Sequence, residues 1–151
     1  MIQRIQSLYL LVSAILGVVC LSMPLGQFFT ADNEQIADLY NLWLRSVETG
    51  AHNFAPWALF ALLLFVTALT LLNIFFYKQR ALQMRTLVFC MILLVGYYAY
   101  LIFFVLMNKL DGSFTPSVTA ALPFVCIVLD YLAFRGILKD ELLVRSLDRL
   151  R

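Results

Sequence analysis

The chain has 151 residues, enough for one domain, and is 63% hydrophobic and 13% charged, against roughly 45–50% and about 25% in soluble domains. A domain of this size cannot bury so many apolar side chains away from water, so the composition excludes an ordinary soluble protein and indicates a membrane protein. The three cysteines lie inside apolar runs and form no C-x-x-C pair, which favours buried hydrophobic side chains over disulfides.

Four apolar stretches are close to the roughly 20 residues that a membrane-crossing helix needs. They cover residues 5–29, 56–77, 87–107 and 118–134, and they predict an all-α membrane protein with four transmembrane helices in a single domain. The first stretch follows Arg4 and therefore looks like a signal peptide. No A-x-A site follows the apolar run from Leu8 to Met23, so we expect this segment to be retained as a helix.

The distribution of basic residues predicts the orientation. Of the 11 Lys and Arg residues, only Arg45 and Lys109 lie in the connections that follow the first and third stretches. The remaining nine lie before the first stretch, between the second and third, and after the fourth. Short segments rich in Lys and Arg stay in the cytoplasm, so both ends of the chain are predicted to be cytoplasmic.

The first outer connection, residues 30–55, is compatible with two local structures. Its apolar residues recur with helical spacing, which favours an amphipathic helix on the membrane surface; they are Ile36, Leu39, Tyr40, Trp43, Leu44 and Val47. The alternative is a short hairpin that turns at Asp32 and Asn33, after Phe28 and Phe29, because Asp and Asn are favoured in turns. We predict the helix and retain the hairpin as the alternative.

The segment after the fourth stretch, residues 135–151, predicts a cytoplasmic amphipathic helix that continues from the membrane, with Gly136 as a possible hinge. Such a helix either lies on anionic lipid or docks on a protein. Its acidic residues weaken attraction to lipid, which favours docking. The predicted docking residues form an apolar face and a set of basic side chains: Leu143, Leu147 and Leu150, with Lys139, Arg145, Arg149 and Arg151.

Asp130 is the one acidic residue within a predicted span. An ionisable residue inside a membrane is costly and often functional. It lies five residues before Arg135, near the predicted cytoplasmic boundary, and Asn73 and Gln6 are expected at a similar depth on other helices. We therefore predict a polar clasp of Asp130, Asn73 and Gln6 that packs the helices, with proton or cation handling by Asp130 as the alternative.

No residue set for catalysis, a cofactor or a metal is evident, since His52 is the only histidine and one histidine with scattered carboxylates makes no zinc site. We therefore expect no enzyme activity and no cofactor. Tyr97, Tyr100 and Phe104 share a helical face, which favours packing over a quinone or lipid pocket. Acidic residues interrupt the basic tail, so nucleic-acid binding is not expected, and contact with a ribosome is the alternative.

Three segments resemble one family: Met1 to Leu10 (MIQRIQSLYL), Phe76 to Arg85 (FYKQRALQMR) and Leu138 to Arg151 (LKDELLVRSLDRLR). Together they resemble small bacterial membrane proteins of unknown function, the domain of unknown function numbered four-two-nine-three. The resemblance spans the whole chain and implies four helices in the inner membrane of Gram-negative bacteria. It implies no activity, substrate or catalytic residue.

The absence of a catalytic constellation leads to a functional hypothesis. We expect a non-enzymatic accessory or scaffold subunit that packs, together with anionic lipid, against a larger inner-membrane assembly, for example one for protein export or envelope biogenesis. The alternative is a small oligomeric transporter or channel that uses Asp130.

Overall fold

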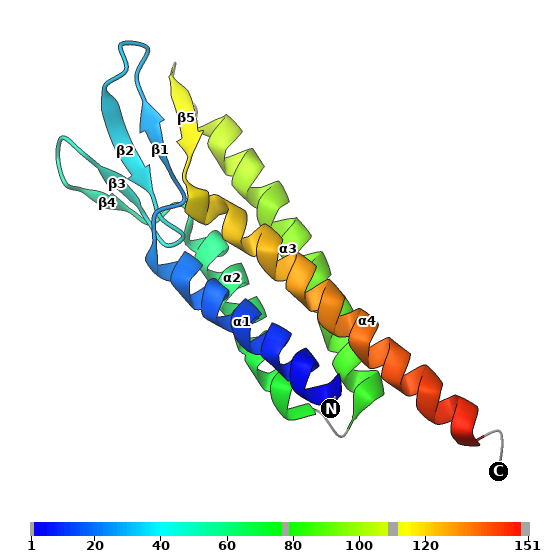
Figure 1. Ribbon diagram of the computed structural model, residues 1–151. Helices are drawn as coiled ribbons and strands as arrows, with labels where there is room; N and C mark the ends of the chain where they lie inside the picture. Colours follow the sequence, from blue (N-terminus) through cyan, green and yellow to red (C-terminus); the bar gives the residue numbers. More distant parts are fainter. Residues whose placement is uncertain (1, 77–78, 109–111, 149–151) are drawn as a thin grey trace.

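The computed structural model describes residues 2–76, 79–108 and 112–148, with positions 2–4, 145, 147 and 148 described by their backbone alone. Within these ranges the chain forms a helical bundle with a small sheet at one end (Figure 1). The helices are α1 (Ile2–Ser22), α2 (Trp57–Phe75), α3 (Arg80–Met107) and α4 (Leu122–Asp148), the last preceded by the 3-10 helix η2 (Val118–Ala121). The predicted all-α fold is therefore incomplete.

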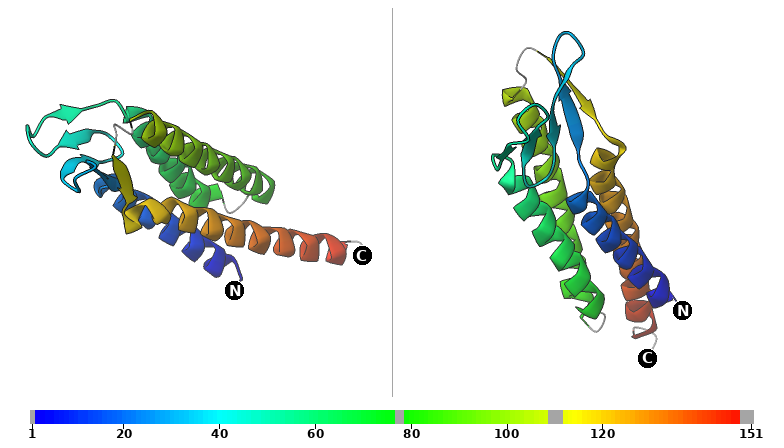
Figure 2. Two further views of the ribbon diagram at one scale, coloured as in Figure 1. Left: turned by 90° about the horizontal axis from the view of Figure 1, so that it is seen from above. Right: turned by 90° about the vertical axis from the view of Figure 1, so that its left-hand side faces the viewer.

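The four described helices pack as a ring in which α1 contacts α2 and α4, and α3 contacts the same two helices (Figure 2). Each is long and apolar enough to cross a membrane, yet only 28–33% of its most apolar window is buried inside the protein. The outward surface of the bundle is thus largely apolar. Such a surface is stable in lipid, because exposing apolar side chains to lipid does not carry the unfavourable free energy of exposing them to water.

The helix boundaries differ from the predicted spans. The first span was expected to reach residue 29, but α1 ends at Ser22 and Gly26–Phe29 form a strand. Pro24 follows the end of α1, in keeping with the inability of proline to continue a helix. At the other end of the bundle, α3 begins at Arg80, whereas the predicted span began at residue 87. The polar residues that precede the apolar stretch are part of the same continuous helix.

Five antiparallel strands form the sheet: β1 (Gly26–Phe29), β2 (Gln35–Leu39), β3 (Leu44–Ser46), β4 (His52–Asn53) and β5 (Ser113–Pro116). Their order is β4-β3-β2-β1-β5, so the connection between α1 and α2 supplies four strands and the connection between α3 and α4 supplies the fifth. The sheet lies at the end of the bundle opposite to that where α1 begins and α4 ends (Figure 1). We call these two ends the sheet end and the tail end.

The surface helix predicted for residues 30–55 is therefore wrong, and the hairpin alternative is correct. β1 pairs with β2, and Asn33 in the turn has φ 63°, a left-handed conformation that Asn adopts more readily than most residues. Phe28, Ala37 and Leu39 are buried on one side of the sheet. The opposite side carries a polar row in register across all five strands: Thr115, Gln27, Asp38, Arg45 and His52.

The buried apolar residues fall into two clusters. The larger includes Cys126 and Cys90 and extends to the sheet. The smaller lies towards the tail end and consists of Leu10, Leu87, Ala133 and Ile137. Asp130 lies between Cys126 and Ala133 on α4, at the boundary between the two clusters.

Candidate functional site

The structure does not bring the predicted clasp together. Gln6 donates a hydrogen bond of 2.8 Å to Asp140. Asn73 donates to the carbonyl of Gln83 at 3.3 Å, and the Gln83 amide donates back to the carbonyl of Asn73 at 3.2 Å. Neither oxygen of Asp130 has a hydrogen-bond partner among the described residues. The three clasp residues therefore belong to separate arrangements.

Axial position explains this correction. Ten residues separate Asp130 from Asp140, which corresponds to about 15 Å along a helix at about 1.5 Å per residue. Gln6 packs against Gly136, six residues beyond Asp130 and so about 9 Å nearer the tail end, and its amide reaches further, to Asp140. Gly136 allows this packing, since a Cβ placed there would lie 3.1 Å from Cγ of Gln6. Gly136 is thus a point of close approach between α1 and α4, and α4 runs through it as one uninterrupted helix.

Asp130 is fully buried, at 0% exposure. Ser13 is its polar neighbour on α1, and the backbone carbonyl of Ser13 accepts a contact of 3.4 Å from the Cys126 thiol. The hydroxyl of Thr70, buried on α2, donates to the carbonyl of Val66 within its own helix at 3.0 Å. A carboxylate without a cationic partner in such surroundings is costly to keep charged. Asp130 is therefore a buried acid without a cationic partner among the described residues, and the Ser13 side chain is its polar neighbour.

A second buried polar group joins the sheet to the bundle and escaped the sequence analysis. Asn41, at 0% exposure, donates to the carbonyl of Cys20 at 2.7 Å. It accepts a hydrogen bond of 2.7 Å from the hydroxyl of Tyr97 on α3. Cys20 lies in the last turn of α1, where backbone carbonyls have no partner within the helix. Nothing in the local sequence distinguishes Asn41 from an exposed turn residue, because both of its partners are distant in the chain.

The aromatic face of α3 is used mainly in packing. Tyr97 and Phe104 are buried in the larger cluster, and the rings of Tyr100 and Phe104 stack with centroids 6.4 Å apart. Tyr98 makes polar contacts instead. Its hydroxyl donates a hydrogen bond to the carbonyl of Ala120 at 2.7 Å and accepts one from the amide of Phe124 at 2.9 Å. That hydroxyl links α3 to the first turn of α4.

Two of the predicted tail residues are described with their side chains. Lys139 and Leu143 are both exposed. The backbone places Arg145 and Leu147 on α4, but their side chains lie outside the description, as do Arg149, Leu150 and Arg151 entirely. The helix continues past the start of α1 and of α3 (Figure 1). In this last part Leu142, Leu143 and Val144 are 59%, 50% and 43% exposed.

The acidic residues of this part of α4 point towards neighbouring helices. Asp140 accepts the hydrogen bond from Gln6 on α1, and Glu141 lies 3.9 Å from Arg80 on α3. Asp140 and Glu141 are therefore directed to neighbouring helices rather than to the outward face, while the side chain of Asp148 lies outside the described residues. Among the described residues, no group of three His, Cys, Asp or Glu is placed to hold a metal ion.

Within the described residues, four helices long and apolar enough to cross a membrane surround a buried carboxylate and are capped by a five-stranded sheet, an arrangement that suggests a small helical membrane protein. Residues 2–150 match the family described as Domain of unknown function (DUF4293). The chain belongs to this family, as the three quoted segments predicted. Searches among curated proteins and among solved structures find no significant match.

Proposed function

We propose that this chain is a non-enzymatic accessory or scaffold subunit of a larger assembly in the bacterial inner membrane. Protein export and envelope biogenesis are the processes in which we expect such an assembly. The tail end of the bundle is cytoplasmic in this proposal, because it holds most of the Lys and Arg residues and short basic segments remain in the cytoplasm. The sheet then lies on the outer surface.

Cysteine labelling tests the orientation. Cysteines introduced at Glu34, in the connection between β1 and β2, and at Ser113, in β5, should react with an impermeant reagent added to intact cells. Cysteines at Gln79 and Ser146, at the tail end, should react only after the membrane is opened. Labelling of position 146 from outside would refute the proposed topology.

One observation carries the scaffold proposal, namely the exposed apolar end of α4. Leu142, Leu143 and Val144 are consecutive, and successive residues of a helix point about 100° apart. Their side chains thus cover a wide arc of the helix. A straight helix that leaves the membrane cannot rest all of this arc on lipid, whereas a protein partner can surround it. Exposed apolar patches of this kind mark interaction sites.

The experiment uses the full chain at native expression. A photo-crosslinking residue at Leu143 should capture one partner, and the same partner should co-purify in mild detergent in stoichiometric amount. A crosslinker at Phe124, which is exposed at the other end of α4, is the matched control. A variant with residues 139–151 shuffled, at constant composition and apolar periodicity, should insert normally and lose the partner. Full recovery by the shuffled tail would refute docking and leave a membrane anchor.

A second candidate function is transport or conduction through a small oligomer that uses Asp130. The observation in its favour is the burial of this carboxylate without a hydrogen-bond partner among the described residues, since ionisable groups retained inside membranes commonly belong to ion or proton pathways. Proteoliposomes with an imposed membrane potential should then show proton flux that Asp130→Asn abolishes. Flux equal to that of protein-free liposomes would refute this candidate.

A further inference from the structure

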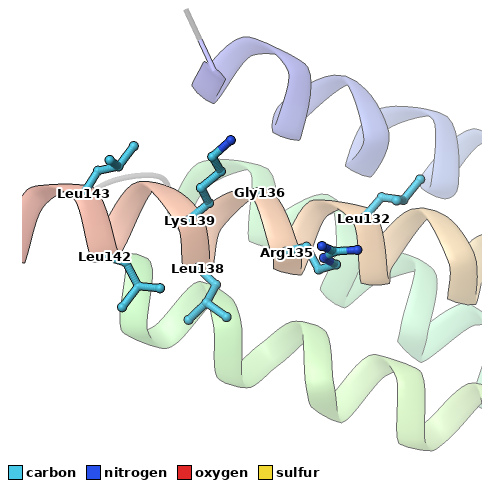
Figure 3. A pocket seen from close by; sticks show the side chains of 7 residues that line it. All are labelled: Leu132, Arg135, Gly136, Leu138, Lys139, Leu142 and Leu143. Atoms are coloured by element: carbon cyan, nitrogen blue, oxygen red, sulfur yellow. The ribbon is translucent and has the colours of Figure 1, made fainter.

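An open groove of about 580 Å³ lies along α4 near the tail end. Figure 3 shows its lining, in which two basic side chains, Arg135 and Lys139, accompany leucines on both sides of the helix. Gly136, which follows Arg135 in the chain, also lines the groove. The leucines are Leu132, Leu138, Leu142 and Leu143.

The charge on this face is uniformly positive. Arg135 and Lys139 are four residues apart, so they are neighbours on one side of the helix. Among the described residues, no carboxylate lies within ion-pair distance of either, because Asp140 is directed to α1 and Glu141 to α3. Two adjacent cations without a counter-charge form a site for an anion.

The groove lies where the apolar part of the bundle ends. Leu132 continues the lipid-facing side of the span, at 39% exposure. Lys139 stands next to Asp140, which contacts the first turns of α1, and next to Glu141, which lies beside the first residue of α3. An anion bound between Arg135 and Lys139 would therefore sit at the depth of lipid headgroups, with Leu132 on the membrane side of it and Leu138 beside it. A ligand that fits this site therefore carries an anionic group and apolar chains in one molecule.

We propose that this groove is a binding site for an anionic phospholipid whose phosphate is held between Arg135 and Lys139. The guanidinium offers a planar pair of donors to the phosphate oxygens, and the ammonium adds a point charge. Leu132 and Leu138 then pack against the acyl chains. A zwitterionic lipid supplies the same chains, but its own cation offsets the attraction. This site does not depend on the scaffold proposal.

The test is titration of the purified full-length protein, in neutral detergent, with phosphatidylglycerol or phosphatidylcholine, read by native mass spectrometry. Phosphatidylglycerol should bind more tightly. The double variant Arg135→Gln, Lys139→Gln should bind it roughly 25-fold more weakly, from about fivefold for each basic residue near an anionic headgroup. Lys78→Gln, Arg85→Gln removes equal charge without touching the ion pair of Arg80 with Glu141, and it is the matched control. It should retain most of the affinity.

A charge-preserving exchange, Arg135→Lys with Lys139→Arg, should also retain binding, so a misfolded glutamine variant would not leave the proposal untested. Soluble glycerol phosphate at equal concentration should not displace the lipid. Equal losses in the glutamine variant and the Lys78, Arg85 control would show a diffuse charge effect and overturn the site. Displacement by glycerol phosphate would overturn the lipid as its ligand.

Discussion

The hydrogen bonds of Asn41 should fix the sheet to the bundle. In Asn41→Leu, a change of similar volume, the carbonyl of Cys20 and the hydroxyl of Tyr97 both lose their partner. A buried group left unsatisfied costs about 1–3 kcal/mol, although single hydrogen bonds in membrane proteins average only about 0.6 kcal/mol. We therefore expect a loss of about 2 kcal/mol in the free energy of unfolding, because two groups are affected.

A double-mutant cycle isolates the bond between Asn41 and Tyr97. Tyr97→Phe alone should cost about 1 kcal/mol, because the Asn41 side-chain oxygen loses its donor. In the Asn41→Leu background the same change should cost almost nothing, since the hydroxyl is already unpaired there. The expected coupling is about 1 kcal/mol, measured by unfolding in mixed micelles with increasing dodecyl sulfate. Strictly additive losses would refute a stabilising hydrogen bond between Asn41 and Tyr97.

The reactivity of the buried cysteines shows which part of the protein becomes more accessible in Asn41→Leu. Cys20 and Cys90 are both buried at 0% exposure, but only Cys20 lies beside Asn41. Asn41→Leu should raise the maleimide reactivity of Cys20, as measured by peptide mass spectrometry, and leave that of Cys90 unchanged. Equal increases at both cysteines would indicate general loosening of the bundle instead.

Three further changes probe helix contacts. Gly17→Val should destabilise the bundle by about 1–3 kcal/mol, since a Cβ at Gly17 would lie 2.5 Å from the Thr67 hydroxyl; Thr67→Ala should restore part of the loss in the same unfolding assay. Gly136→Leu should separate α1 from α4, and a crosslink engineered between positions 6 and 140 should then form more slowly. Gln83→Leu should lower the unfolding free energy by about 1 kcal/mol, within the range for intramembrane hydrogen bonds, because its reciprocal bonds with Asn73 are lost.

The four long apolar helices were predictable because hydropathy and length depend on local sequence alone. The sheet was not, because its pairing depends on residues far apart: Gly26 faces Pro116, and the chain approaches so closely there that a side chain at Gly26 would meet Phe114. Apolar residues from Ile36 to Val47 fit both a helical spacing and strands of a cap. The turn residues Asp32 and Asn33 were the informative signal, and they indicated the correct alternative.

The clasp prediction was wrong about the level of Asp130 along the bundle relative to Gln6 and Asn73. It assumed that Asp130, which lies five residues before Arg135, is level with Gln6 and Asn73. Gln6 instead packs against Gly136 and bonds to Asp140, on a helix that continues to Asp148. The axial offset between α1 and α4 depends on the contact of Gly136 with Gln6, which no periodicity reveals. Sequence spacing gives the rise along one helix but not its offset from the next.

Comparison among the buried polar residues separates Asp130 from the others. Gln6, Asn41 and Asn73 each bond to a residue on another element, so each contributes to packing. Asp130 makes no such bond among the described residues, and it sits where two apolar clusters meet. If packing were its only role, an apolar residue would serve better, since an unpartnered carboxylate opposes burial. Asp130→Asn should therefore unfold no more easily than the natural chain. A clear loss of stability would show instead that the carboxylate makes a stabilising contact, and the argument for transport would lose its basis.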